Sequence, residues 1–271
     1  MSRVSAADSK PVALHPAPVL IYLHIPKTAG TALNDFLGGR FDPGRRHLIE
    51  GPDYHRGARE LVSLARAAPG AVQHVAGHLS YGIHEAFAEP CLYYTVLREP
   101  VDRLVSLYYF IRTAKDHPRH APVADMSLEE FALSGLNPEI ENCQTKMLSG
   151  RPESNFIDGP EACSETDFER AVAHMEADSM MVGLFEDLQG SVFLLCKRMG
   201  WPQQVLGRRN VTKKRPSRVR LSAREIEAIR SVNQFDLRLY EHARERHQAV
   251  LAELSLGDRL RVGRLRWQAR P

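Results

Sequence analysis

The sequence predicts an α/β protein, a three-layer sandwich around a central parallel sheet. Three stretches carry this prediction, because each joins a short apolar run, rich in β-branched or aromatic residues, to an amphipathic helical pattern: residues 19–37, 92–110 and 179–199. Strands that alternate with helices in this way pair in parallel, since the helix carries the chain back to the starting edge of the sheet. A chain of 271 residues is long enough for one such domain with a large buried core.

The composition argues against several other classes of protein. Hydrophobic residues make up 43% of the chain and charged residues 25%, ordinary values for a globular protein and unlike those of disordered or fibrous chains. The net charge of +3 does not indicate nucleic-acid binding, although positive charge could still gather around an anionic ligand. The cysteines show no metal-ligand spacing, so we expect free thiols at Cys91, Cys143, Cys163 and Cys196.

We expect a single domain over residues 19–258, between a flexible leader over 1–18 and a basic tail over 259–271. The leader is rich in Ala, Ser and Pro without a sustained apolar core, which argues against a signal peptide or a membrane anchor. The tail interleaves arginines with leucines and Trp267. It could be disordered, or it could dock on the domain or on a partner, with membrane contact as a weaker alternative.

A first motif, His-Ile-Pro-Lys-Thr-Ala-Gly-Thr over residues 24–31, joins the first predicted strand to the first predicted helix. A tight turn of this kind aims backbone N–H groups and the positive end of the helix at one point, where an anion such as phosphate binds. Lys27 would add a full positive charge, and Thr28 and Thr31 would add hydroxyl donors. The motif therefore predicts an anion site.

The motif differs from the loop of ATP- and GTP-binding proteins. That loop needs a glycine five residues before its Gly-Lys pair, whereas Lys27 precedes the only glycine of this turn. Taken alone, Lys27 is better explained as a surface lysine in an ordinary strand-to-helix turn. A second motif favours the anion site instead.

The second motif is Arg-Glu-Pro-Val-Asp-Arg-Leu-Val-Ser-Leu-Tyr-Tyr-Phe over residues 98–110. Arg98 follows a strand-like run, and Pro100 suits the first turn of a helix. Ser106 lies about two helical turns beyond Pro100. Arg98 and Ser106 could therefore reach one phosphate.

Together the two motifs resemble the sulfotransferases that use 3′-phosphoadenosine 5′-phosphosulfate (PAPS), especially the uronosyl 2-O-sulfotransferases of heparan and dermatan sulfate. The resemblance covers residues 19–112. It implies the sulfotransferase fold with a P-loop-like turn, PAPS as donor, its desulfonated form PAP as product, and no metal. In this family the first motif holds the 5′-phosphosulfate and the second the 3′-phosphate, which implies donor contacts from Pro26, Lys27, Thr28, Ala29, Gly30, Thr31, Ala32, Arg98 and Ser106.

The same resemblance implies a general base between the two motifs. These sulfotransferases carry a Gly-His pair there, and His78 matches it. Imidazole titrates near neutral pH and can take a hydroxyl proton. We expect His74 and His84 to be structural, and Glu85 is the reserve candidate for the base. The family often has a second histidine where this chain has Ala76, so any helper role of that residue is missing here.

Further candidates depend on loops. In this family a late basic loop closes over the nucleotide, which makes Thr212, Lys213 and Arg215 candidates for donor contacts, with a plain basic loop as the alternative. A loop over residues 111–122 gathers basic and imidazole side chains that could bind an anionic sugar or simply be solvated. Its candidate acceptor contacts are Arg112, Lys115 and His117.

An Asn-x-Gln-Thr segment resembles one in the bacterial branch of the family. Asn142 and Gln144 could line the acceptor side of the cleft, or Asn142 could simply cap a helix. Apolar periodicity and capping residues set the remaining elements. We expect strands over 19–25, 73–81, 92–97 and 179–185, a loop over 41–55, and helices over 31–37, 58–68, 100–110, 128–133, 166–175, 188–199 and 222–243.

The sequence thus predicts an O-sulfotransferase that moves a sulfuryl group from PAPS to a hydroxyl of a carbohydrate or glycan. His78 would act as base, and Lys27 would stabilise the leaving group. The alternatives are a nucleotide-dependent phosphotransferase and a non-catalytic nucleotide-binding protein on the same fold. Animal relatives are held in the Golgi membrane by an N-terminal helix that this sequence lacks, so we expect a soluble, cytoplasmic relative of bacterial type without a nucleic-acid partner.

Overall fold

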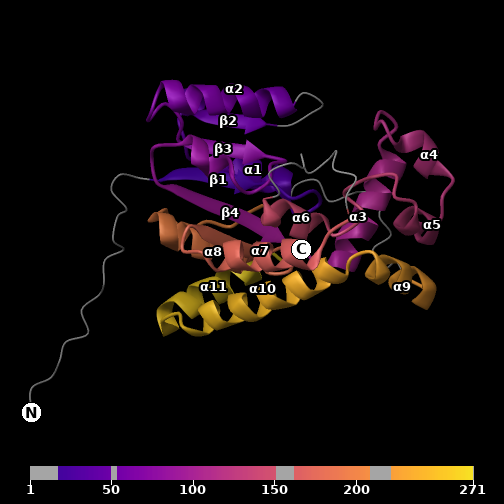
Figure 1. Ribbon diagram of the computed structural model, residues 1–271. Coiled ribbons are helices and arrows are strands. Elements are labelled where there is room, and N and C mark those ends of the chain that lie inside the picture. The colour runs from indigo at the N-terminus through magenta and orange to yellow at the C-terminus, as the bar shows by residue number, and fades with distance from the viewer. Residues whose placement is uncertain (1–17, 50–53, 151–161, 208–220, 271) are drawn as a thin grey trace, which may run out of the picture.

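The computed structural model describes residues 18–49, 54–150, 162–207 and 221–270, and it confirms the predicted α/β class. A five-stranded sheet has the order β2-β3-β1-β4-β5, and every neighbouring pair is parallel. The strands are β1 (Val19–Leu23), β2 (Arg46–Ile49), β3 (His74–Gly77), β4 (Cys91–Leu97) and β5 (Met180–Leu184). Helices lie on both faces of the sheet (Figure 1).

β1 is the central strand and is buried on both faces. None of its residues is more than 2% exposed. Ile21 and Leu23 belong to the core on one face, and Leu20 and Tyr22 belong to the core on the other. The continuous apolar run in the sequence is the expected signature of such a strand.

Two sets of helices complete the layers. The face that carries Ile21 packs against α2 (Tyr54–Ala67), α6 (Cys143–Ser149), α7 (Glu165–Glu176) and α10 (Gln234–Ala252). The face that carries Tyr22 packs against α1 (Gly30–Gly38) and α8 (Leu188–Met199). Outside α8 lies α11 (Leu256–Gln268), whose Val262 and Leu265 share a small apolar cluster with Phe193.

A second cluster of helices stands at the right of Figure 1, beside the sheet. It consists of α3 (Pro100–Thr113), α4 (His120–Ala124), α5 (Leu128–Leu133) and α9 (Ala223–Ser231). Leu104, Ile111 and Phe131 are fully buried at its centre. This cluster holds α3 at the end of β4, where the second motif begins.

Three expectations about secondary structure are wrong. The expected loop over 111–122 contains the last residues of α3 and the start of α4. The expected loop over 41–55 contains a 3₁₀ turn (Pro43–Arg45), the edge strand β2 and the start of α2. The expected helix over 222–243 is broken between α9 and α10, where Asn233 is fully buried. The Asn233 amide donates to the Ile229 carbonyl, and its side-chain oxygen accepts from the Asn142 N–H. One bond is local and the other is with a distant segment, and together they fix Asn233 at the break between the two helices.

The C-terminal segment forms α11 and docks on the domain, one of the alternatives that its sequence left open. The four cysteines are free thiols, as expected. Of the helices described, none combines the length and the apolar character needed to cross a bilayer.

Candidate donor-binding and catalytic site

Three segments meet at the carboxyl edge of the sheet. The turn over 24–29 follows β1, His78 follows β3 and Arg98 follows β4. β1 lies between the other two strands and is parallel to both. Parallel strands end at the same edge, and ligands of open α/β sheets bind there. The structure therefore brings both predicted phosphate motifs and the predicted base to one edge.

The turn between β1 and α1 has an unusual backbone. Lys27 and Ala29 both have φ of 72°, in the left-handed region that residues other than glycine rarely adopt. Thr28, between them, is fully buried, and its hydroxyl donates to the Ile25 carbonyl at 2.8 Å. The Thr28 hydroxyl proton is thus used inside the turn, not toward a ligand as the sequence suggested. Backbone strain of this kind is typical of functional turns.

The N-terminus of α1 lacks the local capping side chain that most of the longer described helices have. Its N-cap residue, Ala29, has no capping side chain, and its first turn contains no acidic residue. By contrast, α3, α7, α8, α9 and α11 each begin with a side chain that accepts from a first-turn N–H. Neither a capping side chain at Ala29 nor a carboxylate in the first turn thus competes with an external anion at the N-terminus of α1.

His24 lies directly against Gly30. A Cβ added at Gly30 would come within 1.5 Å of His24 Nε2, so only glycine leaves room for the imidazole. The His24 ring stacks on the His78 ring, with 4.4 Å between centroids, and on the Tyr22 ring at 5.6 Å. The sequence analysis did not single out His24, although its place at the head of the first motif was a signal.

The His78 ring is held in the tautomer that a base requires. Its Nδ1 lies 2.8 Å from the backbone carbonyl oxygen of His24. Because a carbonyl only accepts, Nδ1 carries the proton, and Nε2 of the neutral ring keeps its lone pair. The preceding Gly77 permits the close approach of β2, since a Cβ there would lie 2.1 Å from the Ile49 carbonyl oxygen. The Gly-His pair thus combines a packing requirement with a positioned imidazole.

Lys27 is held beside α3. Its Nζ lies 3.8 Å from the centroid of the Phe110 ring, a cation–π contact. Burial lowers the pKa of Lys27 to about 8, an effect that Glu139 opposes and Arg98 reinforces. An anion bound at the turn would favour the charged form and raise this pKa.

Arg98 connects the two motifs. Its Nη1 donates to the Lys27 carbonyl at 3.0 Å, and its guanidinium lies 4.1 Å from the centroid of the Phe185 ring. The Gln144 side chain binds both backbone groups of Arg98. The Arg98 N–H donates to Gln144 Oε1 at 2.9 Å, and Gln144 Nε2 donates to the Arg98 carbonyl at 3.0 Å. The arginine at the end of β4 is therefore fixed against the turn after β1.

The sequence model of the Galactose-3-O-sulfotransferase family matches residues 3–266. The chain belongs to this sulfotransferase family. Human heparan sulfate 2-O-sulfotransferase 1 is 30% identical over 197 residues, 65% of this chain and 53% of the human protein. Human galactose-3-O-sulfotransferase 2 is 30% identical over 164 residues, 59% of this chain and 40% of that one. The predicted resemblance is thus confirmed at the level of the family.

The chain spans about half the length of the curated heparan sulfate 2-O-sulfotransferases that it matches. Among solved structures, mouse sulfotransferase SULT7A1 complexed with PAP aligns with a TM-score of 0.41 and 13% identity, over 80% of this chain and 64% of that one.

In this chain, Ser106 lies on the same side of α3 as Phe110, because residues four apart in a helix share a face. It is 8% exposed. Since the Phe110 ring meets Lys27, this side of α3 faces the turn. Ser106 is therefore on the same side of α3 as the candidate donor site.

The structure gives Asn142 and Gln144 other tasks than contact with an acceptor. Gln144 is fully buried, with both ends of its amide bound to the Arg98 backbone. Asn142 accepts from the N–H groups of Phe235 and Asp236, so it caps α10. Of the alternatives left open for Asn142, helix capping is the one observed, although the capped helix is remote in sequence. Both residues support the site from behind.

Of the three candidates in the loop over 111–122, only His117 is brought near the turn. Its ring meets the Phe110 ring edge-on at 5.7 Å. Burial lowers the pKa of His117, and Lys27 is among the nearby cations that lower it further. Arg112 is exposed and donates to the Tyr108 hydroxyl, and Lys115 is exposed. Thr212, Lys213 and Arg215 lie outside the described residues.

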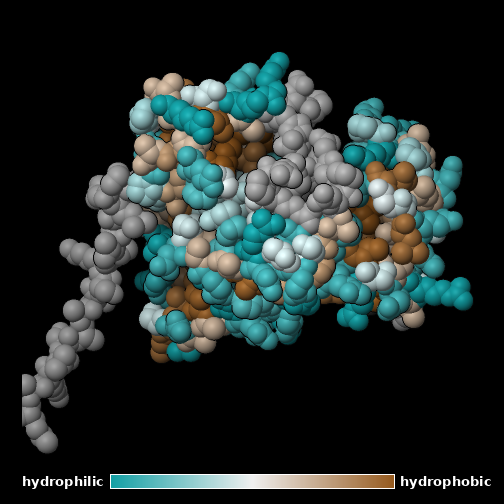
Figure 2. Space-filling view, in the orientation of Figure 1, coloured by the Kyte–Doolittle hydropathy of each residue, from teal (hydrophilic) through white to brown (hydrophobic). Residues whose placement is uncertain are grey.

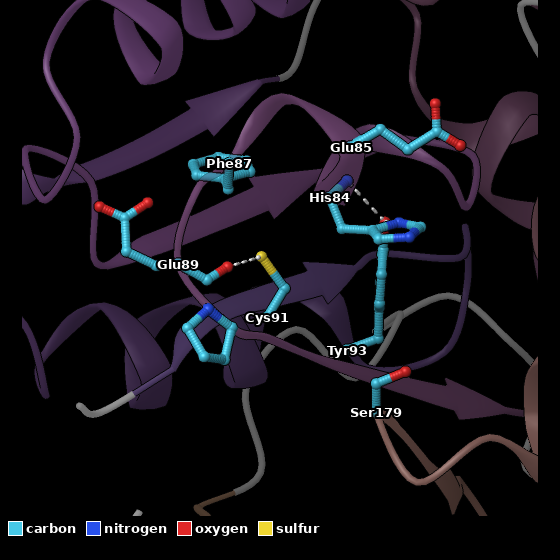
Figure 3. A pocket seen from close by; sticks show the side chains of 8 residues that line it. His84, Glu85, Phe87, Glu89, Cys91, Tyr93 and Ser179 are labelled. Atoms are coloured by element: carbon cyan, nitrogen blue, oxygen red, sulfur yellow. Dashed lines mark hydrogen bonds between the residues drawn. The ribbon is translucent and has the colours of Figure 1, made fainter. Parts of the chain in front are cut away.

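Glu85, the reserve base, lies elsewhere. With His84 it lines a pocket of about 450 Å³ that also includes Cys91 and Ser179 (Figure 3). Cys91 begins β4 and Ser179 precedes β5, so this pocket lies at the amino end of the strands, opposite the candidate site. His84 Nδ1 lies 3.0 Å from the Tyr93 hydroxyl. Glu85 is therefore a poor substitute for His78.

His74 is structural, as expected. Its Nδ1 lies 2.9 Å from the Leu20 carbonyl, and its ring stacks on Phe41. Burial lowers the pKa of His74 to about 4, which keeps the ring neutral in the core.

Proposed function

We propose that this chain transfers a sulfuryl group from PAPS to a saccharide hydroxyl. The observation that carries the proposal is the hydrogen bond from Arg98 to the Lys27 carbonyl, which joins the two phosphate motifs into one cationic site. Membership of the family supports the same chemistry. PAPS would supply the activated sulfuryl group, and the residues of the chain would bind it, orient it and move a proton.

The anionic groups of the donor fit the residues of the site. The N–H groups that open α1 and the Lys27 ammonium would hold the 5′-phosphosulfate. Arg98 and Ser106 would hold the 3′-phosphate, with charge-assisted hydrogen bonds from the guanidinium. This division explains why Lys27 and Arg98 come from two neighbouring strand ends. By the family resemblance, Thr212, Lys213 and Arg215 remain candidates for the nucleotide.

The protein groups would act as follows. His78 Nε2 would take the proton of the acceptor hydroxyl as that oxygen forms a bond to sulfur. The bond from sulfur to the 5′-phosphate oxygen would break, and Lys27 with the N–H groups of the turn would stabilise the negative charge that grows on that oxygen. His24 would keep the His78 ring oriented through its carbonyl and its stacked ring.

The first test is calorimetric titration with PAP, AMP and ATP without Mg²⁺. A 3′-phosphate site should bind PAP about 10–100-fold more tightly than AMP, the range expected for charge-assisted hydrogen bonds. Ser106→Ala and Arg98→Lys should reduce this preference, and Arg66→Ala, an exposed arginine on α2, should not. Equal binding of PAP and AMP, or binding of ATP only with Mg²⁺, would favour a phosphotransferase.

The second test is sulfuryl transfer from labelled PAPS. The relatives are named for heparan sulfate and for galactose, so the acceptors are a desulfated heparan-type polysaccharide and a galactose-terminated oligosaccharide. His78→Ala should lower the rate about 10²–10⁴-fold and leave PAP binding intact, whereas His84→Ala should not change it. Binding of PAP without transfer to any hydroxyl acceptor would point to a non-catalytic protein.

A further inference from the structure

α11 is fixed to α8 at both of its ends. Near its start, Asp258 is bound by Lys197 from the last turn of α8. Near its end, Arg266 Nε donates to the Asp187 carboxylate, which caps the start of α8, at 2.7 Å. The two helices are therefore antiparallel, and one face of α11 is firmly attached to the domain.

The opposite face of α11 is also apolar, and it is exposed. Leu256, Leu260 and Trp267 are 68%, 67% and 69% exposed. Their spacing of four and seven residues places them in one stripe along the helix. In Figure 2 hydrophobic surface reaches the lower left of the molecule, where Figure 1 places α11. Most surface helices have one apolar face, so a second one needs an explanation.

Arginines flank this stripe. Arg259 and Arg264 lie on either side of it by helical geometry, and Arg270 follows the helix directly. All three are exposed, and none forms an ion pair within the part of the chain that the structure describes. The outward face of α11 is thus purely apolar and cationic.

We propose that the outward face of α11 binds the surface of a bilayer that contains anionic lipids. An interfacial helix has this pattern, with leucine and tryptophan at the level of the headgroups and arginines beside them. A second copy of the chain fits less well, because a symmetric contact would bring the same arginines together. The stripe is also narrow and convex, unlike the pocketed centre of a protein interface.

The test is flotation of the full chain with vesicles of phosphatidylcholine alone or with about 30% phosphatidylserine, at low and high salt. We expect binding to the anionic vesicles at least about 10-fold stronger than to the neutral ones, and weaker in high salt. The triple variant Arg259→Gln, Arg264→Gln, Arg270→Gln should lose about 10²-fold in partitioning. Leu260→Ser with Trp267→Ser should lose binding even to anionic vesicles.

A matched triple variant provides the control. Arg59→Gln, Arg66→Gln and Arg230→Gln remove the same charge from exposed positions on α2 and α9 and should leave partitioning nearly unchanged. The proposal is overturned if both triple variants lose binding equally, if neutral and anionic vesicles bind alike, or if no vesicle binds. It is also overturned if sedimentation shows a dimer that Leu260→Ser dissociates, since the stripe would then belong to a second copy. Thermal melting checks that each variant folds.

Discussion

The N-termini of α1 and α6 have similar backbone conformations, but only that of α6 is capped by a carboxylate from another helix. Each follows an N-cap residue in the left-handed conformation, Ala29 for α1 and Asn142 for α6, and neither N-cap side chain caps its own helix. At α6 the Asp236 carboxylate accepts from the N–H groups of Gln144 and Thr145, at 3.1 and 2.8 Å. At α1 the N-cap residue has no such group, and the first turn has no acidic residue.

The difference separates a structural helix terminus from the one that we propose as a binding site. The positive end of α6 is neutralised by a buried carboxylate from α10, and Asn142 caps α10 in return. The positive end of α1 lies beside a lysine and lacks a local acid. A helix N-terminus whose N–H groups already bind a carboxylate of the same protein has no place for an external anion. An N-terminus without such a carboxylate is suited to bind one. The following variants test this contrast, from the largest expected effect to the smallest.

The largest effect should come from Lys27. Lys27→Met should lower kcat/KM about 10²–10³-fold, because it removes the cation that we propose to stabilise the leaving group, and should change stability little. Lys146→Met is the matched control, since Lys146 binds Glu141 at 2.6 Å and lies within α6. It should destabilise the fold by about 1–2 kcal/mol and spare activity. Rate assays measure kcat/KM and urea unfolding measures stability for each variant. Equal losses of activity in the two variants would contradict the difference proposed between the two helix termini.

Asp236→Ala should remove the carboxylate that caps the N-terminus of α6. The variant leaves two buried N–H groups and the Thr145 hydroxyl without their acceptor, so we expect a loss of about 2–3 kcal/mol in the free energy of unfolding. Urea denaturation followed by circular dichroism measures this loss, and Asp236→Asn should give an intermediate value. A loss below about 0.5 kcal/mol would show that the carboxylate is dispensable.

Thr31→Asp should add a carboxylate to the N-terminus of α1. A carboxylate in the first turn of α1 would interact favourably with the helix dipole and repel the donor phosphates. We expect PAP to bind about 10–30-fold more weakly and the melting temperature to stay the same or rise. Thr31→Asn, which adds no charge, is the control for the side chain. Calorimetry that finds equal PAP affinity in both variants would place the donor elsewhere.

The smallest effect should be a pH dependence. The pKa of Lys27 is lowered to about 8, so the ammonium is present at pH 7 and is progressively lost above pH 8. PAP should therefore bind about 10-fold more weakly at pH 9 than at pH 7. Lys27→Arg stays charged throughout this range and should flatten the dependence. If PAP affinity falls with pH as steeply in Lys27→Arg as in the unmodified protein, the titrating group is not Lys27.

Much of this site could be predicted from local sequence. The strand-to-helix turns at Lys27 and Arg98 are continuous segments with strong apolar runs, so their geometry follows from neighbours in the chain. The edge strand β2 was missed because it is short and half exposed and contains Arg46 and His47, which give no apolar alternation.

The supports of the site could not be predicted in the same way. Gln144 reaches the Arg98 backbone across 46 positions, and Asp236 reaches Thr145 across 91. Nothing in the composition of either segment indicates its partner. His24 was missed for the same reason, because its contacts with Gly30 and His78 exist only after β1 and β3 pair.

Asp236 binds the start of α6, and Gln144 of α6 binds the Arg98 backbone. These contacts have a consequence for folding during synthesis of the chain. Both phosphate motifs leave the ribosome within the first half of the chain, yet the Arg98 backbone is held by Gln144, and α6 is completed only by α10. We therefore expect that, in a nascent chain that ends before residue 236, Arg98, the residue proposed for the 3′-phosphate, is not yet held in place. Donor binding would then be acquired late in synthesis, after the C-terminal helices have joined the sheet.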